Sequence, residues 1–211
     1  MINLGGSKLA AADGGHEMTI MVNVIGTFLL ALLLLPKLKA SSRPSSRILT
    51  IVTSGVHART NLPEWKDQNT FDALRTTSNI GPRYPTSKLL EVLVVRELAP
   101  LLTGSGVILN MLCPGLCHSE LTREVRSSWR WWAYKLLLAR SAEQGSRTLV
   151  AAASAGPESH GAYMQHGVVN DGALSEFVRS PEGEQAQKKV WKELAAILEE
   201  AQPGVTSVVQ V

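Results

Sequence analysis

Two long apolar runs of helical length dominate the hydrophobic pattern of the chain. Residues 16–38 predict a first helix, with Asn23 early in its apolar part, and Pro36 is expected to end or bend this run near its last turn. Residues 88–102 predict a second helix that is apolar on most sides. Both helices are too apolar for a single buried face, which predicts self-association through residues 22–35 and 88–102.

Short β-rich runs lie between and after these helices. Residues 47–54 form one such run and end in Ser54, and residues 107–112 predict a second buried strand. A buried parallel strand would carry Ser54 to its carboxyl end, which is where open α/β sheets bind ligands. The alternation of strands and helices therefore predicts an α/β fold with a parallel sheet.

The remaining segments carry boundary signals. A Ser-Ala-Glu-Gln capping box opens a predicted helix over residues 141–153, and Ser-Pro-Glu opens a last helix over residues 180–201. Residues 61–83 are polar and weakly periodic, which predicts a long loop beside a substrate cleft. The aromatic cluster at residues 127–135 fits equally a helix packed into the core or a lid over a hydrophobic ligand. We expect His57 to be a solvent-side loop residue without a catalytic role.

Tyr84 and Lys88 are four residues apart at the start of the second apolar helix, so they share one helical face. A free tyrosine has a pKa of about 10, and an ammonium group about 4 Å away would stabilise the phenolate by roughly 4 kcal/mol. This pairing predicts that Tyr84 titrates near neutrality and transfers protons. The spacing alone also occurs by chance on many helices, and it is the upstream hydroxyl of Ser54 that favours the chemical interpretation.

Composition excludes several classes of function. The 21 basic and 18 acidic residues leave a formal charge of +3 without a run of like charge, so nucleic-acid binding is not predicted. Cys113 and Cys117 have only His118 beside them as a further ligand, which predicts neither a metal site nor a disulfide. The apolar run 22–35 is shorter than the roughly 20 residues of a membrane span, and no signal peptide is recognised, so we expect a cytoplasmic protein without a transmembrane segment. The length predicts one domain over residues 1–211.

Four short motifs follow one another along the chain. They are Val22-Asn23-Val24-Ile25-Gly26, Val52-Thr53-Ser54, Tyr84-Pro85-Thr86-Ser87-Lys88 and Cys113-Pro114-Gly115-Leu116-Cys117-His118-Ser119. In this order the motifs resemble those of the short-chain dehydrogenase/reductase superfamily. Residues 139–147 are similar to its retinol-dehydrogenase-like and fungal biosynthetic branch, so the resemblance covers nearly the whole chain.

This resemblance implies an NAD(P)-dependent oxidoreductase. Tyr84 would give or take the proton, Lys88 would lower the pKa of Tyr84, Ser54 would orient the reacting oxygen, and Asn23 would complete a proton relay. The cofactor, NADP or NAD, would contact Tyr84 and Lys88 together with Asn3, Pro114, Gly115, Cys117 and Ser119. The substrate would be the carbonyl or alcohol of a hydrophobic small molecule of fungal secondary metabolism, and relatives pair as homodimers through the same two helices.

The amino-terminal part of the family pattern is not found. Residues 1–6 resemble the end of the Asn-Asn-Ala-Gly strand, and no strand-turn-helix with three spaced glycines seats a pyrophosphate anywhere in the sequence. The resemblance therefore predicts an N-terminally truncated, Rossmann-like, doubly wound parallel sheet, the carboxyl-terminal portion of one family domain. We expect such a chain to bind NAD(P)H weakly, with a dissociation constant of about millimolar or higher.

Two alternatives stay open from the sequence. The chain could be a non-redox relative that keeps an acid-base pocket, as an isomerase or cyclase, or one that keeps only the helices that pair subunits. It could also be an inactive fragment of a longer enzyme. Cofactor binding distinguishes the oxidoreductase from these alternatives.

Overall fold

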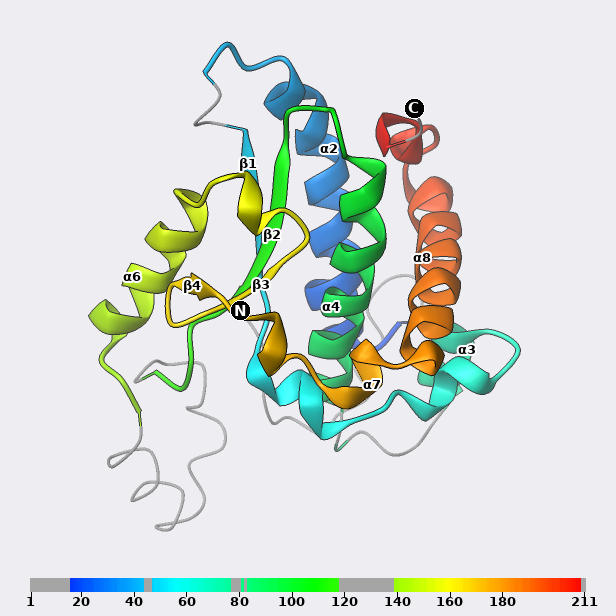
Figure 1. Cartoon of the computed structure of the whole chain (residues 1–211). Coiled ribbons are helices and arrows are strands. Elements are labelled where there is room, and N and C mark those ends of the chain that lie inside the picture. The colour runs from blue at the N-terminus through cyan, green and yellow to red at the C-terminus, as the bar shows by residue number, and fades with distance from the viewer. Residues whose placement is uncertain (1–15, 44–46, 77–80, 82, 118–138, 210–211) are drawn as a thin grey trace.

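The structure is a computed structural model that describes residues 16–43, 47–76, 81, 83–117 and 139–209. Its centre is a four-stranded sheet of order β1-β2-β3-β4 (Figure 1). Strands β1 (Ile48–Val52), β2 (Ile108–Cys113) and β3 (Tyr163–Gln165) are parallel, and β4 (Val168–Val169) pairs antiparallel with β3. Helices cover both faces, with α6 (Ala142–Ala153) on one side of β1 and β2 and α4 (Arg83–Leu101) on the other. The predicted α/β, Rossmann-like sheet is confirmed.

The predicted first helix is continuous but changes its winding. It consists of α1 (Met18–Ile20), a π-helical turn η1 (Met21–Gly26) and α2 (Thr27–Lys39). The Thr27 hydroxyl donates to the Val22 carbonyl, five residues earlier, at 3.1 Å. Pro36 lies inside the last turn of α2, which ends at Lys39, one residue beyond the predicted helix over residues 16–38.

Helix α4 is enclosed by other elements over most of its length. It lies between the sheet and α8 (Pro181–Ala201), and η1 and η3 (Gly55–Arg59) also pack against it. Its side chains from residue 86 to residue 95 are all buried. The part of α4 over residues 88–95 is therefore not a free pairing surface, because α8 and the sheet already use it.

The outer side of the first helix keeps an apolar stripe. Val22, Leu30, Leu33 and Leu34 are exposed, and Leu30 retains 58% of its surface. Homodimer formation through residues 22–35 stays a prediction, and this stripe is the surface it would use.

Helices α6 and α8 begin at the predicted residues, each with a serine N-cap. At α6, the Ser141 hydroxyl accepts from the Gln144 N–H at 3.1 Å, and the Gln144 side chain accepts from the Ser141 N–H at 3.2 Å. At α8, the Ser180 hydroxyl accepts from the Gly183 N–H at 3.1 Å. The short helix α7 (Glu176–Arg179) precedes α8, and η8 (Val205–Val209) follows it and packs against α2.

Several short elements were not predicted. The expected loop over residues 61–83 contains η4 (Pro63–Lys66) and α3 (Thr70–Thr76). Two further turns, η6 (Pro157–Ser159) and η7 (Asp171–Ala173), border the β3–β4 hairpin. That hairpin turns through His166 and Gly167, with φ of 58° and 84°, the left-handed pair of a type I′ turn. The expectations for residues 1–6 and 127–135 concern segments outside the described residues.

The first helical segment is longer than its apolar run suggested. Met18–Lys39 spans 22 residues and, by length and composition alone, could cross a membrane, and half of its most apolar window is buried inside the fold. A core helix has the same composition, because it too is surrounded by apolar side chains. The absence of a transmembrane segment and the cytoplasmic location stay predictions.

Candidate active site

The carboxyl ends of β1 and β2 and the start of α4 meet at one edge of the sheet (Figure 1). Ser54 follows β1 and caps η3, accepting a hydrogen bond from the Val56 N–H at 3.4 Å. Tyr84 is the second residue of α4, and the Ser54 side chain is close enough to its phenol to lower the pKa of Tyr84 by hydrogen bonding. The fold thus joins two hydroxyl groups that are thirty residues apart in the chain.

The Tyr84 phenol is strongly perturbed, but not in the predicted direction. Burial raises the pKa of Tyr84 to about 12; the hydrogen bond with Ser54 opposes this rise, and the Glu91 carboxylate and Cys113 add to it. The expectation that Tyr84 titrates near neutrality is therefore wrong for this structure. The main reason is the burial of the phenol, and the contacts of Lys88 add a second.

Lys88 is buried and turned toward a carboxylate. Its Nζ donates to Glu91 Oε1 at 2.8 Å and to the Val52 carbonyl at 3.0 Å, and it lies 5.7 Å from the centroid of the Tyr84 ring. Burial raises the pKa of Glu91 to about 7, although the charge and hydrogen bond of Lys88 and a hydrogen bond from Thr53 favour its ionised form. Glu91 was not predicted as a site residue; its signal was an acidic residue inside an apolar helix.

Asn23 reaches the helix of Tyr84 and Lys88 through a serine. Its Nδ2 donates to Ser87 Oγ at 2.9 Å, and the Ser87 hydroxyl donates to the Tyr84 carbonyl at 2.9 Å. The π-helical turn of η1 holds this buried amide. The structure therefore links Asn23 to the backbone of Tyr84, and the predicted proton relay toward Lys88 stays a prediction.

The Pro-Gly loop leaves the end of β2 beside the serine turn. The Gly55 N–H donates to the Cys113 sulfur at 3.1 Å, which ties the two loops together. Gly115 has a φ of 82°, a conformation that favours glycine, and the Cys117 thiol closes the loop onto the carbonyls of Pro114 and Gly115 at 3.6 and 3.7 Å. Cys113 and Cys117 are free thiols. The predicted cofactor residues Asn3 and Ser119 lie outside the described residues.

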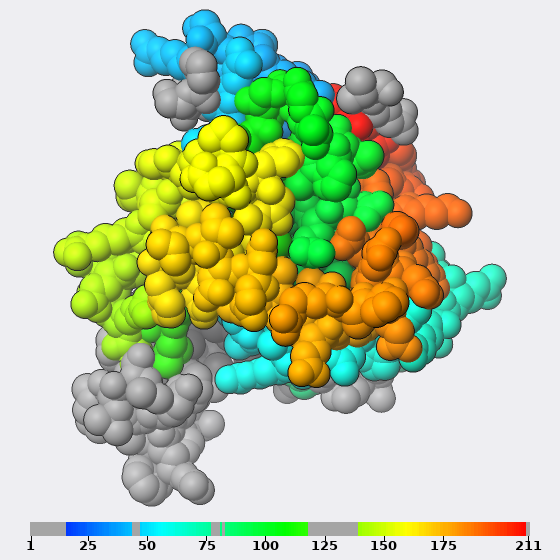
Figure 2. All heavy atoms as spheres, in the orientation of Figure 1, coloured from blue at the N-terminus to red at the C-terminus, as the bar shows by residue number. Residues whose placement is uncertain are grey.

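His57 was expected on the solvent side and is fully buried. Its Nδ1 lies 2.9 Å from the Ser54 carbonyl, and its Nε2 accepts from the Ser175 N–H at 3.2 Å. Its ring lies 5.3 Å from that of Tyr163. Burial lowers the pKa of His57, against a smaller rise from the Ser54 carbonyl. Figure 2 shows the chain around η3 directly below the chain of α7 on this face of the molecule.

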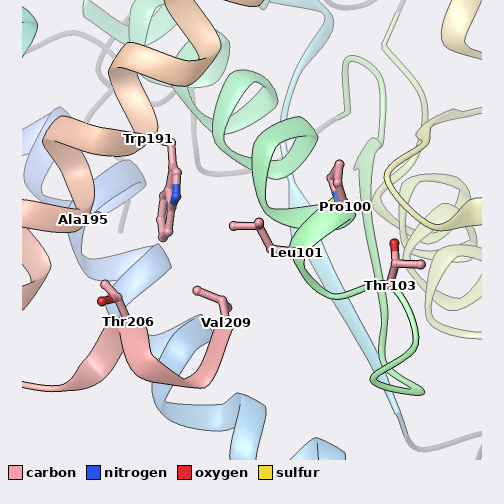
Figure 3. Close-up of a pocket in the computed structure, with 7 residues that line it drawn as sticks. All are labelled: Pro100, Leu101, Thr103, Trp191, Ala195, Thr206 and Val209. Carbon is pink, nitrogen blue, oxygen red and sulfur yellow. The ribbon is translucent and has the colours of Figure 1, made fainter. Parts of the chain in front are cut away.

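A cavity elsewhere on the molecule does not belong to this site. A cavity of about 630 Å³ is bounded by the end of α4, α8 and η8, and it is lined by Pro100, Leu101, Thr103, Trp191, Ala195, Thr206 and Val209 (Figure 3). Tyr84 is sixteen residues before Pro100 on the same helix, a separation of about 24 Å. The cavity therefore cannot deliver a ligand to the Tyr84 phenol.

Comparison with known proteins identifies the family. No family model matches the chain. Over 202 residues the chain is 45% identical to the short-chain dehydrogenase anuD of Penicillium roqueforti, covering 90% of this chain and 53% of that protein. It is 42% identical over 215 residues to the short chain dehydrogenase/reductase dmxR8 of Cryptosporiopsis sp., covering 96% and 64%. It is 36% identical to the short-chain dehydrogenase/reductase ffsI of Aspergillus flavipes, covering 90% and 58%.

The chain belongs to the short-chain dehydrogenase/reductase family. The predicted likeness to its fungal branch is confirmed, since all three of these relatives are fungal. This short-chain dehydrogenase/reductase spans about half to two thirds of the length of these relatives.

The nicotinamide cofactor that the family implies can be tested against the described residues. At the reacting end they fit: a phenol with a serine partner, a lysine one turn along the helix, and a glycine at positive φ after β2. A Cβ added at Gly115 would lie 3.8 Å from the Arg140 guanidinium, an ordinary van der Waals contact and the nearest one among the described residues. Among the described residues we recognise no binding site for the rest of the cofactor, the pyrophosphate and the adenosine.

Proposed function

We propose that this short-chain dehydrogenase/reductase is an NAD(P)-dependent oxidoreductase that reduces a carbonyl, or oxidises an alcohol, on a hydrophobic small molecule of fungal secondary metabolism. The single observation that carries the proposal is that the fold brings the Tyr84 phenol beside the Ser54 side chain at the carboxyl edge of the sheet, one helical turn from Lys88. The names of the fungal relatives support the same class of reaction.

Tyr84 is the proton donor in the direction of reduction. Its raised pKa keeps the phenol protonated at neutral pH, and a phenol is a stronger acid than the alcohol formed from a carbonyl. In the direction of oxidation Tyr84 would first lose its own proton to solvent, and the phenolate oxygen would then take the hydroxyl proton of the substrate. The Ser54 hydroxyl, beside the phenol, orients the reacting oxygen with a second hydrogen bond.

The cofactor, NADP or NAD, supplies or accepts the hydride when it is bound. Tyr84, Lys88, Pro114, Gly115 and Cys117 are the described residues that would hold its reacting end. Asn23 and Ser87 keep the first turn of α4 in place, because they tie the Tyr84 carbonyl to η1.

The proposal is tested with the purified 211-residue chain, a panel of apolar ketones and quinones, and NADPH or NADH. Loss of nicotinamide absorbance that depends on the ketone is the expected result, and Tyr84→Phe should abolish it. Tyr163→Phe is the matched control, because it removes another buried phenol hydroxyl. A rate for Tyr84→Phe within about tenfold of the parent would exclude the assigned proton donor.

Cofactor titration separates this function from the non-redox alternative. Calorimetry with NADPH and NADH measures whether the described end of the site is sufficient for binding. Substrate conversion without nicotinamide consumption, still dependent on Tyr84, would favour an isomerase or cyclase instead.

A further inference from the structure

Glu91 is an acidic side chain in the centre of an apolar helix. It retains 2% of its surface, and its neighbours Leu90 and Val92 are completely buried. Its Oε1 meets Lys88 Nζ at 2.8 Å, and its Oε2 has no hydrogen-bond partner among the described atoms. A buried carboxylate with an unused oxygen is costly, so a hydrophobic core alone does not account for it.

The Lys88–Glu91 pair changes what Tyr84 experiences. The ammonium is drawn toward Glu91 and the Val52 carbonyl, and the charge of the pair cancels. Burial is the main reason that the pKa of Tyr84 is raised, and the Glu91 carboxylate adds to the rise, which is the direction opposite to that of a bare lysine. Glu91 therefore offsets what the lysine, one turn from the phenol, would do to the acidity of Tyr84.

We propose that Glu91 is a positioning residue that holds the Lys88 ammonium against the end of β1 and cancels its charge, so that protonation of Glu91 frees Lys88 to act on Tyr84. This inference rests on the proposed function, because it assigns a control to the same proton donor. Only one proton moves, on or off the Glu91 carboxyl, and no bond between heavier atoms changes.

Few other titratable groups lie near the Lys88–Glu91 pair among the described residues. Tyr84 shares its helix, Thr53 follows β1, Cys113 ends β2, and η3 contributes His57, whose pKa is lowered by burial. The first helix contributes the neutral amide of Asn23 through Ser87. Helix α8 meets α4 through Gln187 and Glu97, almost two turns beyond Glu91.

The direction of the effect follows from charge. With Glu91 ionised, the lysine is compensated and the phenol stays a weak acid; with Glu91 protonated, the uncompensated ammonium favours the phenolate. Because burial raises the pKa of Glu91 to about 7, this change falls near neutral pH. Proton donation by Tyr84 should therefore become easier as the solution is acidified through neutrality.

The test is Glu91→Gln in the full chain, read by the NMR titration of ¹³Cζ-labelled tyrosine, with the Tyr84 signal assigned from Tyr84→Phe. The apparent pKa of Tyr84 should fall by at least about one unit. Glu184→Gln is the matched control: it makes the same chemical change in an exposed lysine pair on α8 and should leave Tyr84 unchanged. Equal Tyr84 titrations in the two variants would overturn the proposal.

A second measurement covers the case in which Glu91→Gln does not fold. In the unmodified chain, the ¹³Cδ signal of Glu91 should titrate near neutrality, and the Tyr84 signal should shift with the same midpoint. A Glu91 carboxyl that stays ionised well below neutrality, or a Tyr84 signal that ignores its titration, would contradict the proposal. Neither readout needs turnover, so an inactive chain that shows the coupled shift would refute the oxidoreductase assignment and leave the Glu91 assignment standing.

Discussion

Acidification is expected to destabilise the chain through His57. Its Nε2 accepts from the Ser175 N–H, so the folded state needs the neutral imidazole; protonation would set two N–H groups against each other. Because burial lowers the pKa of His57 below 6.5, the unfolded chain binds the extra proton first. The stabilisation is complete above the unfolded pKa and is lost as the pH falls through it.

The size of this effect has a ceiling. If the folded imidazole stays neutral down to about pH 5, the loss relative to pH 8 is about 1.5 units at 1.36 kcal/mol each, or about 2 kcal/mol. His16 adds to the total, because burial and Arg75 lower its pKa too. The contribution of His57 must therefore be isolated with a variant.

The assay is urea unfolding of the parent and of His57→Gln at about pH 8 and about pH 5. Glutamine places an amide oxygen where it can accept from the Ser175 N–H, and it does not titrate. Between about pH 8 and about pH 5, the free energy of unfolding of the variant should fall by up to about 2 kcal/mol less than that of the parent. This difference does not depend on the stability of the variant at pH 8. His166→Gln, at an exposed position, is the control, and its free energy of unfolding should fall on acidification by as much as that of the parent. An identical acid loss in the parent and His57→Gln would refute the reasoning.

Three further outcomes are expected. Tyr84→Phe should abolish carbonyl reduction and change the free energy of unfolding by less than about 1 kcal/mol, measured by turnover and urea unfolding; a large stability loss would contradict its half-buried setting. Gly183→Ala should cost about 3 kcal/mol in thermal unfolding, because the added Cβ would overlap the Phe177 carbonyl, whereas Gly172→Ala has room; equal losses would count against this. If the chain pairs through the exposed stripe of α2, light scattering should show a dimer at micromolar concentration that Leu30→Lys dissociates; a monomeric parent would exclude that pairing.

Local signals made much of the fold predictable. Ser141 and Ser180 are caps whose hydrogen bonds involve residues at most three positions away, so the sequence contains both partners of the interaction. The strands before Ser54 and Pro114 are apolar runs bounded by turn residues, and they pair in parallel as expected. The Tyr84–Lys88 spacing on one helix likewise needs no tertiary information.

The errors concern interactions that only the tertiary fold creates. The acidity of Tyr84 depends on its burial and on where Lys88 points, and Lys88 points toward a carboxylate three residues further along the helix. The burial of His57 depends on Ser175, which is 118 residues away. The short strand β3 has only three residues, too few for a periodicity to be recognised.

The π-helical turn η1 also limits which length changes the gene can tolerate. A π turn is equivalent to an α-helix with one extra residue, accommodated locally as a bulge. Deleting one codon within Met21–Gly26 would let a regular α-helix form, and the parts on either side would keep nearly the same orientation, because the bulge absorbs the extra residue. Ile20 and Phe28 would then keep their buried positions, whereas the same deletion within α2 would rotate everything before it by about 100°. A single-codon deletion is therefore expected to be tolerated better in this turn than in α2.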